Sequence, residues 1–356
     1  MIKYNFGAGP SILPKEVFAE ASAAVLNFEN SGLSILEISH RSTEFEAVIE
    51  EAEQLVRELL NVPRGYSILF LQGGASGQFA QVPLNLLPED GFAAYLDTGV
   101  WASKAIKEAK RIGDVRVVAS SSDQNYTYIP KEVQVPAEAA YFHITTNNTI
   151  YGTEIFETPN SPVPLVADMS SDIFSKEIDV SQYGLIYAGA QKNLGPAGMV
   201  LVIVKDDLLG QSGRKLPAFH DYQSHVNAKS MFHTPPTFAV YVAMLTLRWL
   251  KKLGGVKVME QENVVKARLL YEEIDRNSLF TAAAQAADRS RMNVVFVAKS
   301  PEVEAAFLSY AQARNLIGLK GHRSVGGFRA SIYNAMQIQG VNALVDVMQE
   351  FEDQYK

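Results

Sequence analysis

A single lysine between two apolar runs constrains the fold of this chain most. Lys192 lies in a turn of small residues, 188–198, which follows the apolar run 184–189 and precedes a second one, 199–204. Both runs are apolar enough for strands that are covered on both faces, as in parallel sheets. Open α/β sheets bind ligands at strand–loop junctions, and a desolvated lysine there can lose its proton and attack a carbonyl. A surface lysine in a turn would leave the same pattern, so Lys192 needs support from elsewhere.

A carboxylate provides that support. The apolar run 163–167 ends at Asp168, and an adjacent strand could bring Asp168 close to Lys192. Pyridoxal phosphate enzymes need a lysine for the aldehyde carbon and a carboxylate that keeps the pyridine nitrogen protonated. An aspartate at a strand end more often caps a turn, but its pairing with Lys192 favours a cofactor site.

A glycine-rich loop adds a third element. Residues 67–79 run from an apolar strand through Gly73 and Gly74 into a helix. The free amides and the dipole of a helix N-terminus attract anions. A plain βα turn would look the same, and the loop matches neither the Walker pattern nor the dinucleotide fingerprint. Together with Lys192 and Asp168, it predicts a phosphate cup.

Taken together, six segments resemble the phosphoserine aminotransferases, which are fold-type I, class-V pyridoxal phosphate enzymes. The segments keep the family's order and spacing, and they are residues 6–14, 39–41, 73–79, 188–198, 231–238 and 320–332. The resemblance implies an α/β fold: a large cofactor-binding domain, residues 15–257, with a mostly parallel seven-stranded sheet sandwiched by helices, and a smaller α/β domain from residues 1–14 and 258–356.

The resemblance also implies a reaction. The amino group of L-glutamate would pass to 3-phosphohydroxypyruvate, a phosphorylated keto acid, and give O-phospho-L-serine and 2-oxoglutarate for serine biosynthesis. Use of the enzyme in the related phosphohydroxythreonine step of pyridoxal phosphate synthesis stays open. Lys192 would hold the cofactor and move the proton, while Asp168 would pair with the ring nitrogen.

The same resemblance assigns the other contacts. Trp101 would stack on the cofactor ring and Thr149 would hydrogen-bond the ring oxygen, although a core tryptophan and a turn threonine are the plain alternatives. The further cofactor-binding residues would be Ala75, Ser76, Gln191, His233 and Thr234.

Anionic substrates need cations. By resemblance, Arg329 would clamp the α-carboxylate with a bidentate fork, and His40 with Arg41 would meet the distal carboxylate or phosphate. His322 and Arg323 would reach the phosphate end. Without the resemblance, the plain alternative for Arg41 is a solvated residue ahead of a helix. The plain alternative for Arg329 is a salt bridge in the smaller domain.

Two positions depart from the family pattern. One common version of the family has an arginine where this chain has Ser76, so the substrate phosphate would depend more on the other cations. His233 replaces the usual asparagine, keeps a donor and titrates near neutrality. By resemblance, the segment 231–238 crosses to a second copy, which implies a homodimer with composite sites.

Composition agrees with such an enzyme. The 356 residues are 47% hydrophobic and contain no cysteine, so there is no disulfide and no thiol nucleophile. A net charge of −7 disfavours a nucleic-acid partner. Without a signal pattern or a membrane-length apolar run, we expect a cytoplasmic protein with small-molecule substrates, no membrane partner and no metal.

Alternation of apolar runs predicts the remaining elements. Residues 43–60 read as a helix with a capping box of Thr43 and Glu46. Further strands are expected at residues 68–71, 92–96, 115–119, 140–144 and 292–298, and further helices at 102–112, 237–253, 264–276, 303–314 and 341–351.

The sequence leaves other functions to compare. An aminotransferase that uses alanine or serine with glyoxylate is the main alternative, because its pocket would not need His40 beside Arg41. A non-catalytic protein of the same fold would not need Lys192, Asp168 and Arg329. A cysteine desulfurase lacks its nucleophile here, and a Rossmann dehydrogenase lacks the third glycine after Gly7 and Gly9.

Overall fold

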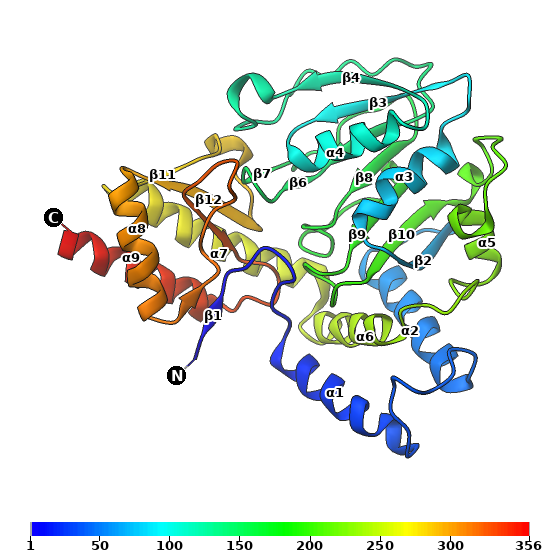
Figure 1. Cartoon of the computed structure of the whole chain (residues 1–356), viewed down its shortest axis with the longest axis horizontal. Helices are drawn as coiled ribbons and strands as arrows, with labels where there is room; N and C mark the ends of the chain where they lie inside the picture. The colour runs from blue at the N-terminus through cyan, green and yellow to red at the C-terminus, as the bar shows by residue number, and fades with distance from the viewer. Residues whose placement is uncertain (1, 356) are drawn as a thin grey trace.

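The computed structural model describes residues 2–355. Its helices are α1 Lys15–Leu26, α2 Thr43–Leu59, α3 Ala75–Leu86, α4 Val100–Ala109, α5 Tyr222–Asn227, α6 Thr237–Lys252, α7 Gly255–Arg276, α8 Pro301–Ala313 and α9 Ile338–Tyr355. The strands are β1 Tyr4–Asn5, β2 Tyr66–Gln72, β3 Phe92–Asp97, β4 Asp114–Ser120, β5 Phe142–Thr145, β6 Asn147–Asn148, β7 Thr153–Glu154, β8 Leu165–Asp168, β9 Leu185–Gly189, β10 Met199–Lys205, β11 Phe280–Ala282, β12 Asn293–Ala298, β13 Leu316–Ile317 and β14 Phe328–Ser331. Figure 1 shows their arrangement.

A seven-stranded sheet forms the centre of the larger part of the molecule. Its order is β2-β10-β9-β8-β5-β3-β4, and only β10 runs against the others. A short turn without a crossover helix joins β9 to β10, so β10 must return antiparallel to β9. The predicted mostly parallel sheet of seven strands is therefore confirmed, and the run 199–204 is its antiparallel member.

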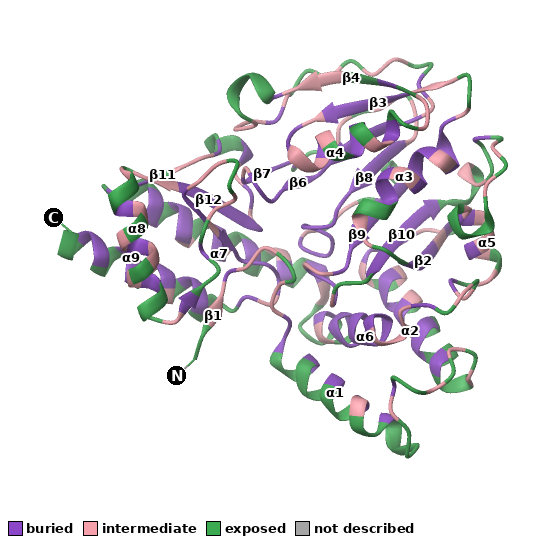
Figure 2. Cartoon of the chain, viewed as in Figure 1, coloured by how far each residue is buried: buried purple, intermediate pink, exposed green. Residues whose placement is uncertain are grey.

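Helices cover both faces of this sheet, as predicted. On one face, side chains such as Leu71 and Val202 pack with Phe79 and Val82 of α3 and Ile106 of α4. On the other face, a second core includes residues of α1, α2 and α6. Figure 2 shows the sheet as the buried interior, with exposed residues on the outer sides of the helices. Apolar alternation along the strands thus becomes two separate hydrophobic layers.

The capping box predicted for the helix at residues 43–60 is wrong by one residue. Ser42, not Thr43, is the N-cap of α2, because its side chain accepts a hydrogen bond from the Phe45 amide at 3.3 Å. Thr43 is already helical. The residue three places after the cap is therefore Phe45, whose apolar side chain cannot close a capping box.

The chain ends in a smaller α/β unit with its own core. The antiparallel sheet β11-β12-β14 packs with α7, α8 and α9, and Phe6 from the N-terminal segment lies in the same core. β1 pairs in parallel with β13, which ties that segment to the C-terminal part. The proposed division at residues 257 and 258 falls inside the continuous helix α7, and it stays a prediction.

Candidate active site

Lys192 and Asp168 come from neighbouring parallel strands, as the sequence predicts. Asp168 is the last residue of β8 and lies in register with Tyr187 of β9, while Lys192 follows the end of β9 in the turn. Burial raises the pKa of Asp168, and the positive charge of Lys192 opposes that rise. Burial lowers the pKa of Lys192, against the negative charges of Asp168 and Asp172. The two groups therefore influence each other directly.

Ser170 holds the carboxylate, and sequence reasoning missed it. Its amide donates to Asp168 Oδ1 at 2.9 Å and its hydroxyl donates to the same oxygen at 2.6 Å. The hydroxyl oxygen also accepts from the Gly189 amide at 3.0 Å, which links the ends of β8 and β9. A serine two residues after a strand-end aspartate is a common turn signal, and that signal could have identified Ser170.

The glycine-rich loop leads into α3 beside this pair. Gly73 and Gly74 have φ values of 103° and 71°, in the region that favours glycine. Beyond them, Ala75 and Ser76 begin α3, so their amides have no partner within the helix. A Cβ placed on Gly189 would lie 3.4 Å from the Ala75 nitrogen and 2.8 Å from Gln191 Oε1. The anion-binding end of α3 and Gln191 thus lie together above the end of β9.

Trp101 and Thr149 are in direct contact. Trp101 Nε1 donates to Thr149 Oγ1 at 2.9 Å, and Lys192 Nζ lies 5.7 Å from the centre of the indole ring. Lys104 Nζ lies 4.3 Å from the centre of the same ring. Lys104 was not among the predicted residues, although its position three residues after Trp101 on a helix places both on one face.

Arg329 points its guanidinium toward the same region. Its Nη1 donates to the Thr149 carbonyl at 3.3 Å, and its positive charge acts on Lys192. Burial lowers the pKa of Arg329. Its Nε is buried and has no hydrogen-bond partner within residues 2–355, where no ion pair involves it either. A buried arginine with a free donor is suited to an anionic ligand.

His322 lies near both Arg329 and Arg323, and no hydrogen bond joins His322 or Arg323 to Lys192 within the described residues 2–355. Burial, followed by the charges of Arg329, Arg323 and Lys104, lowers the pKa of His322. The Nδ1 atom of its ring accepts a hydrogen bond from the Ser324 amide at 3.2 Å. The predicted basic pair therefore belongs to a larger positive region that also contains Lys104.

The N-terminal segment fixes the lysine turn. The Ser11 amide donates to the Gln191 carbonyl at 2.9 Å, and the Ser11 hydroxyl donates to the Lys192 carbonyl. A Cβ on Gly9 would lie 3.6 Å from side-chain carbons of both Gln191 and Lys192. Residues 6–14 thus pack along the backbone of the turn that holds Lys192. This contact gives a structural reason why these residues are one of the six segments that carry the family resemblance.

Four predicted residues are not brought to Lys192 by contacts within the described chain. No hydrogen bond or ion pair joins His40 or Arg41 to Lys192, Asp168 or Arg329 across residues 2–355. Arg41 is exposed, and His40 Nε2 is buried without a partner in that range. His233 stacks near Phe219, with ring centres 4.9 Å apart, and the Thr234 carbonyl accepts from Gln72 Nε2 at 2.7 Å.

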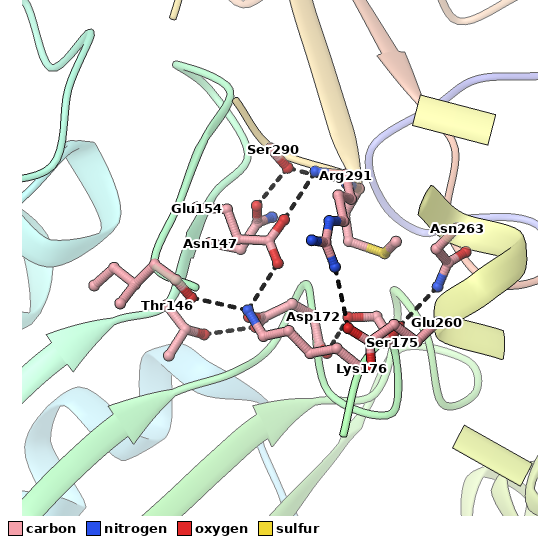
Figure 3. A network of polar contacts seen from close by, with 12 residues as sticks. Thr146, Asn147, Glu154, Asp172, Ser175, Lys176, Glu260, Asn263, Ser290 and Arg291 are labelled. Carbon is pink, nitrogen blue, oxygen red and sulfur yellow. Dashed lines mark hydrogen bonds and ion pairs between the residues drawn. The ribbon is translucent and has the colours of Figure 1, made fainter. Parts of the chain in front are cut away.

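A buried ionic network joins the two parts of the chain (Figure 3). Lys176 Nζ donates to Glu154 Oε1 at 2.7 Å and lies 3.4 Å from Asp172 Oδ2. Glu154 Oε2 accepts from the Arg291 amide at 2.8 Å, and the Arg291 side chain pairs with Glu260 of α7 at 3.1 Å. Since Asp172 acts on Lys192, this network connects the small unit electrostatically with the lysine.

These residues fit pyridoxal phosphate. An unpaired lysine, a carboxylate on the neighbouring strand, an aromatic ring and an open helix N-terminus match the aldehyde, ring nitrogen, ring face and phosphate of that group. The described part of the chain contains no group of three or more His, Cys, Asp or Glu that could hold a metal. None of its helices has the length and apolarity to cross a membrane.

Comparison with known proteins identifies the family. The family model for class-V aminotransferases matches residues 3–344. The chain belongs to this family. This class-V aminotransferase is 59% identical over 355 residues to a phosphoserine aminotransferase of Bacteroides thetaiotaomicron, and the alignment covers 99% of each chain. The resemblance found in the sequence is confirmed.

Solved structures agree. The class-V aminotransferase superimposes on the phosphoserine aminotransferase of Bacillus circulans subsp. alkalophilus with a TM-score of 0.97 at 45% identity, covering 100% of this chain and 99% of the other. A PLP-bound phosphoserine aminotransferase from Trichomonas vaginalis matches with a TM-score of 0.93 at 39% identity, covering 98% and 100% of the chains. The predicted fold-type I architecture is therefore confirmed.

Proposed function

We propose that this chain transfers the amino group of L-glutamate to 3-phosphohydroxypyruvate, with pyridoxal phosphate as cofactor. The observation that carries the proposal is the pairing of Lys192 with Asp168 on neighbouring strands, beside Trp101 and an arginine with a free Nε. The identity of 59% to a curated phosphoserine aminotransferase over nearly the whole length supports the choice of substrate class.

The cofactor, when bound, supplies an aldehyde that exchanges amino groups and a ring that accepts electrons from the substrate's α-carbon. With the cofactor bound, the neutral Lys192 amine would accept the substrate's α-proton as a base and later donate it as an acid, and burial of Lys192 favours this neutral form. The Asp168 carboxylate stabilises a proton on the ring nitrogen by charge pairing.

The remaining residues bind and orient. The α3 amides at Ala75 and Ser76 receive the cofactor phosphate, and Trp101 packs against the ring. Arg329 clamps the α-carboxylate of either substrate, since its Nε is free to donate. The positive region of His322, Arg323 and Lys104 attracts the phosphate of the keto acid.

A homodimer with composite sites completes the proposal. No hydrogen bond or ion pair joins His40, Arg41, His233 or Thr234 to Lys192, Asp168 or Arg329 within residues 2–355, and a second copy offers the route by which they take part. The phosphohydroxythreonine step is a second candidate reaction, because that substrate carries the same anionic groups with one more hydroxylated carbon. The enzyme would act in the cytoplasm.

A keto-acid panel with L-glutamate as donor tests the proposed substrate. We expect 2-oxoglutarate to form fastest with 3-phosphohydroxypyruvate and slowly with pyruvate or glyoxylate, measured on the same holoenzyme. The Arg329→Lys variant is the matched control. It keeps the positive charge at this position but loses the planar guanidinium that holds the α-carboxylate by two hydrogen bonds. A preference for glyoxylate would overturn the proposal in favour of the alternative aminotransferase.

A further inference from the structure

Asn293 lies in β12 of the smaller unit, and its side chain is completely buried. In the three-stranded sheet it stands opposite Ser331 of β14, while Val295 stands opposite Arg329. Side chains two residues apart on a strand share a face, so Ser331 and Arg329 point to the same side of β14. Asn293 is therefore directly beside the strand that carries the guanidinium of the site.

The side-chain amide of Asn293 joins the two parts of the chain. Its Nδ2 donates to Ser331 Oγ at 2.9 Å and to the Tyr333 hydroxyl at 3.1 Å. Its Oδ1 accepts from Nδ2 of Asn147, in β6 of the larger part, at 2.8 Å. The Tyr333 hydroxyl donates onward to the Ala8 carbonyl at 2.7 Å. One amide thus connects β14, β6 and the N-terminal segment that packs along the lysine turn.

The direction of each bond in this set is fixed. A backbone carbonyl only accepts, so the single proton of Tyr333 goes to Ala8, and the Tyr333 oxygen accepts from Asn293. The amide nitrogen of Asn293 therefore faces Tyr333, and its oxygen faces Asn147. Asn147 Oδ1 in turn accepts from the Ser290 hydroxyl (Figure 3). Turning over either asparagine amide would put two donors or two acceptors face to face, so the set has one arrangement.

Arg329 depends on support of this kind. Within residues 2–355 its side chain makes one hydrogen bond, from Nη1 to the Thr149 carbonyl at 3.3 Å, and no ion pair. A binding group must be held within about 0.5 Å of its productive position, and a long side chain with one weak contact relies on its strand for that. Thr149 follows Asn147 by two residues. The bonds of Asn293 and Arg329 therefore join one short segment of the larger part to one small sheet.

We infer that Asn293 is a positioning residue, which acts through Ser331 and β6 to hold Arg329 where it binds the α-carboxylate of the substrate. The inference rests on the proposed function, in that Arg329 must clamp that carboxylate. Loss of the Asn293 amide leaves buried donors and acceptors without partners, and such groups cost free energy. The sheet would shift or admit water to satisfy them, and the guanidinium would move with β14.

A double-mutant cycle tests the inference on the holoenzyme. The probe is glutarate, which has both carboxylates of glutamate but no amine, so calorimetry measures its affinity without turnover. We expect Arg329→Ala to weaken glutarate binding at least tenfold and Asn293→Leu to weaken it about tenfold. Combined in one chain, the two changes should weaken binding no more than Arg329→Ala alone, because Asn293 acts through Arg329. Additive losses would overturn the inference.

Asn277→Leu is the matched control. Asn277 is also a buried asparagine of the smaller unit, and its Nδ2 also donates twice, to Glu273 Oε1 at 2.8 Å and to the Met348 carbonyl at 3.3 Å. These partners all lie in the smaller unit, away from β14. Asn277→Leu should lower the free energy of unfolding, as Asn293→Leu does, but leave glutarate affinity unchanged. An equal loss of glutarate affinity in both variants would show general destabilisation and overturn the inference.

Ser331→Ala decides the question if Asn293→Leu does not fold. It removes only the hydroxyl that Asn293 binds on β14, two residues from Arg329. We expect glutarate binding to weaken severalfold, with no further loss in the Arg329→Ala chain. KM for glutamate should rise by the same factor, while kcat at saturating glutamate stays close to the wild-type value. Wild-type glutarate affinity in Ser331→Ala would overturn the inference.

The outcomes separate this inference from the proposed function. If Arg329→Ala binds glutarate as tightly as the wild type does, the proposed role of Arg329 is wrong. If Arg329→Ala loses affinity while Asn293→Leu binds glutarate as Asn277→Leu does, only the role of Asn293 is wrong.

Discussion

Trp101 Nε1 donates a hydrogen bond of 2.9 Å to Thr149 Oγ1. The indole nitrogen can only donate, so it occupies one lone pair of the hydroxyl and leaves the Thr149 proton free. That proton can be given to an acceptor on the cofactor ring, while the indole ring is held beside Lys192. Two residues that the sequence predicts separately therefore work as one unit.

This contact makes the hydroxyl of Thr149 testable. We expect Thr149→Val to weaken cofactor binding by about 0.5–1.5 kcal/mol, because a neutral hydrogen bond is lost and the Trp101 donor is left without a partner. Thr149→Ser keeps the hydroxyl and should bind as the wild type does. Cofactor titration followed by tryptophan fluorescence measures both variants. Equal affinity in Thr149→Val would argue against the assigned contact.

Lys192→Ala tests the role of the lysine itself. We expect turnover to vanish and the visible absorbance of lysine-bound cofactor to disappear, because alanine has no amine to react or to move a proton. Far-ultraviolet circular dichroism should stay unchanged, since Lys192 makes no side-chain hydrogen bond or ion pair within the described chain. Normal turnover in this variant would refute the mechanism.

Arg329 and Arg41 should differ in which substrates they serve. Arg329→Ala should weaken every amino and keto acid by about 1.5–3 kcal/mol, the value of a hydrogen bond to a charged group. Arg41→Ala should weaken only substrates with a distal anion. Steady-state KM values for glutamate and alanine distinguish the two effects, and equal losses for both amino acids in both variants would contradict the assignment.

Lys176→Met tests the buried network of Figure 3. Lys176 is the only cation that pairs with Glu154 and Asp172 in the described chain. Without it, two buried carboxylates lack a counter-charge, so the free energy of unfolding should fall by about 3–5 kcal/mol at pH 7.5. Urea unfolding measures this. Lys251→Met, which breaks an exposed pair with Glu58, should cost at most about 1 kcal/mol.

The loss in Lys176→Met should depend on pH. Burial raises the pKa of Asp172 to about 6, above the ordinary 3.8. The folded state then binds more protons than the unfolded state between these values, so the penalty of the ionised group is present above pH 6 and is relieved as pH falls toward 3.8. Without Lys176 the pKa rises further, and the difference from wild type should shrink at pH 5. A larger difference at pH 5 than at pH 7.5 would contradict this reading.

The sequence predicts most of the site because its chemistry lies at strand ends. Lys192 and Asp168 could be paired from apolar runs alone, since parallel strands end at one edge of a sheet. The turn after Asp168 also offers a signal for Ser170, but the bond of its hydroxyl to the Gly189 amide could not be predicted, because it depends on how β8 and β9 lie side by side. Residues 15–26 were not predicted as helix α1, whose buried side is only Val17, Ala21 and Ala24, a stripe too narrow to detect by pattern.

The segment that carries His233 and Thr234 allows a test of composite sites. His233 packs between Phe219 and His225, and the Thr234 carbonyl is bound to Gln72, so the segment is held while the Thr234 side chain is exposed. Two prolines, Pro235 and Pro236, follow and lower the entropy cost of this conformation. An anchored segment with an exposed tip is suited to reach a second copy of the chain.

We therefore expect complementation between two inactive variants. Lys192→Ala chains are refolded together with chains blocked at the tip by Thr234→Trp. If sites are shared, each hetero-dimer contains one site with both defects and one site with neither, so activity should return to about half of that of a wild-type dimer at equal hetero-dimer concentration. Native mass spectrometry confirms that hetero-dimers form, and Lys192→Ala mixed with itself is the control. A mixture that stays inactive although hetero-dimers are present would mean that each chain builds its site alone.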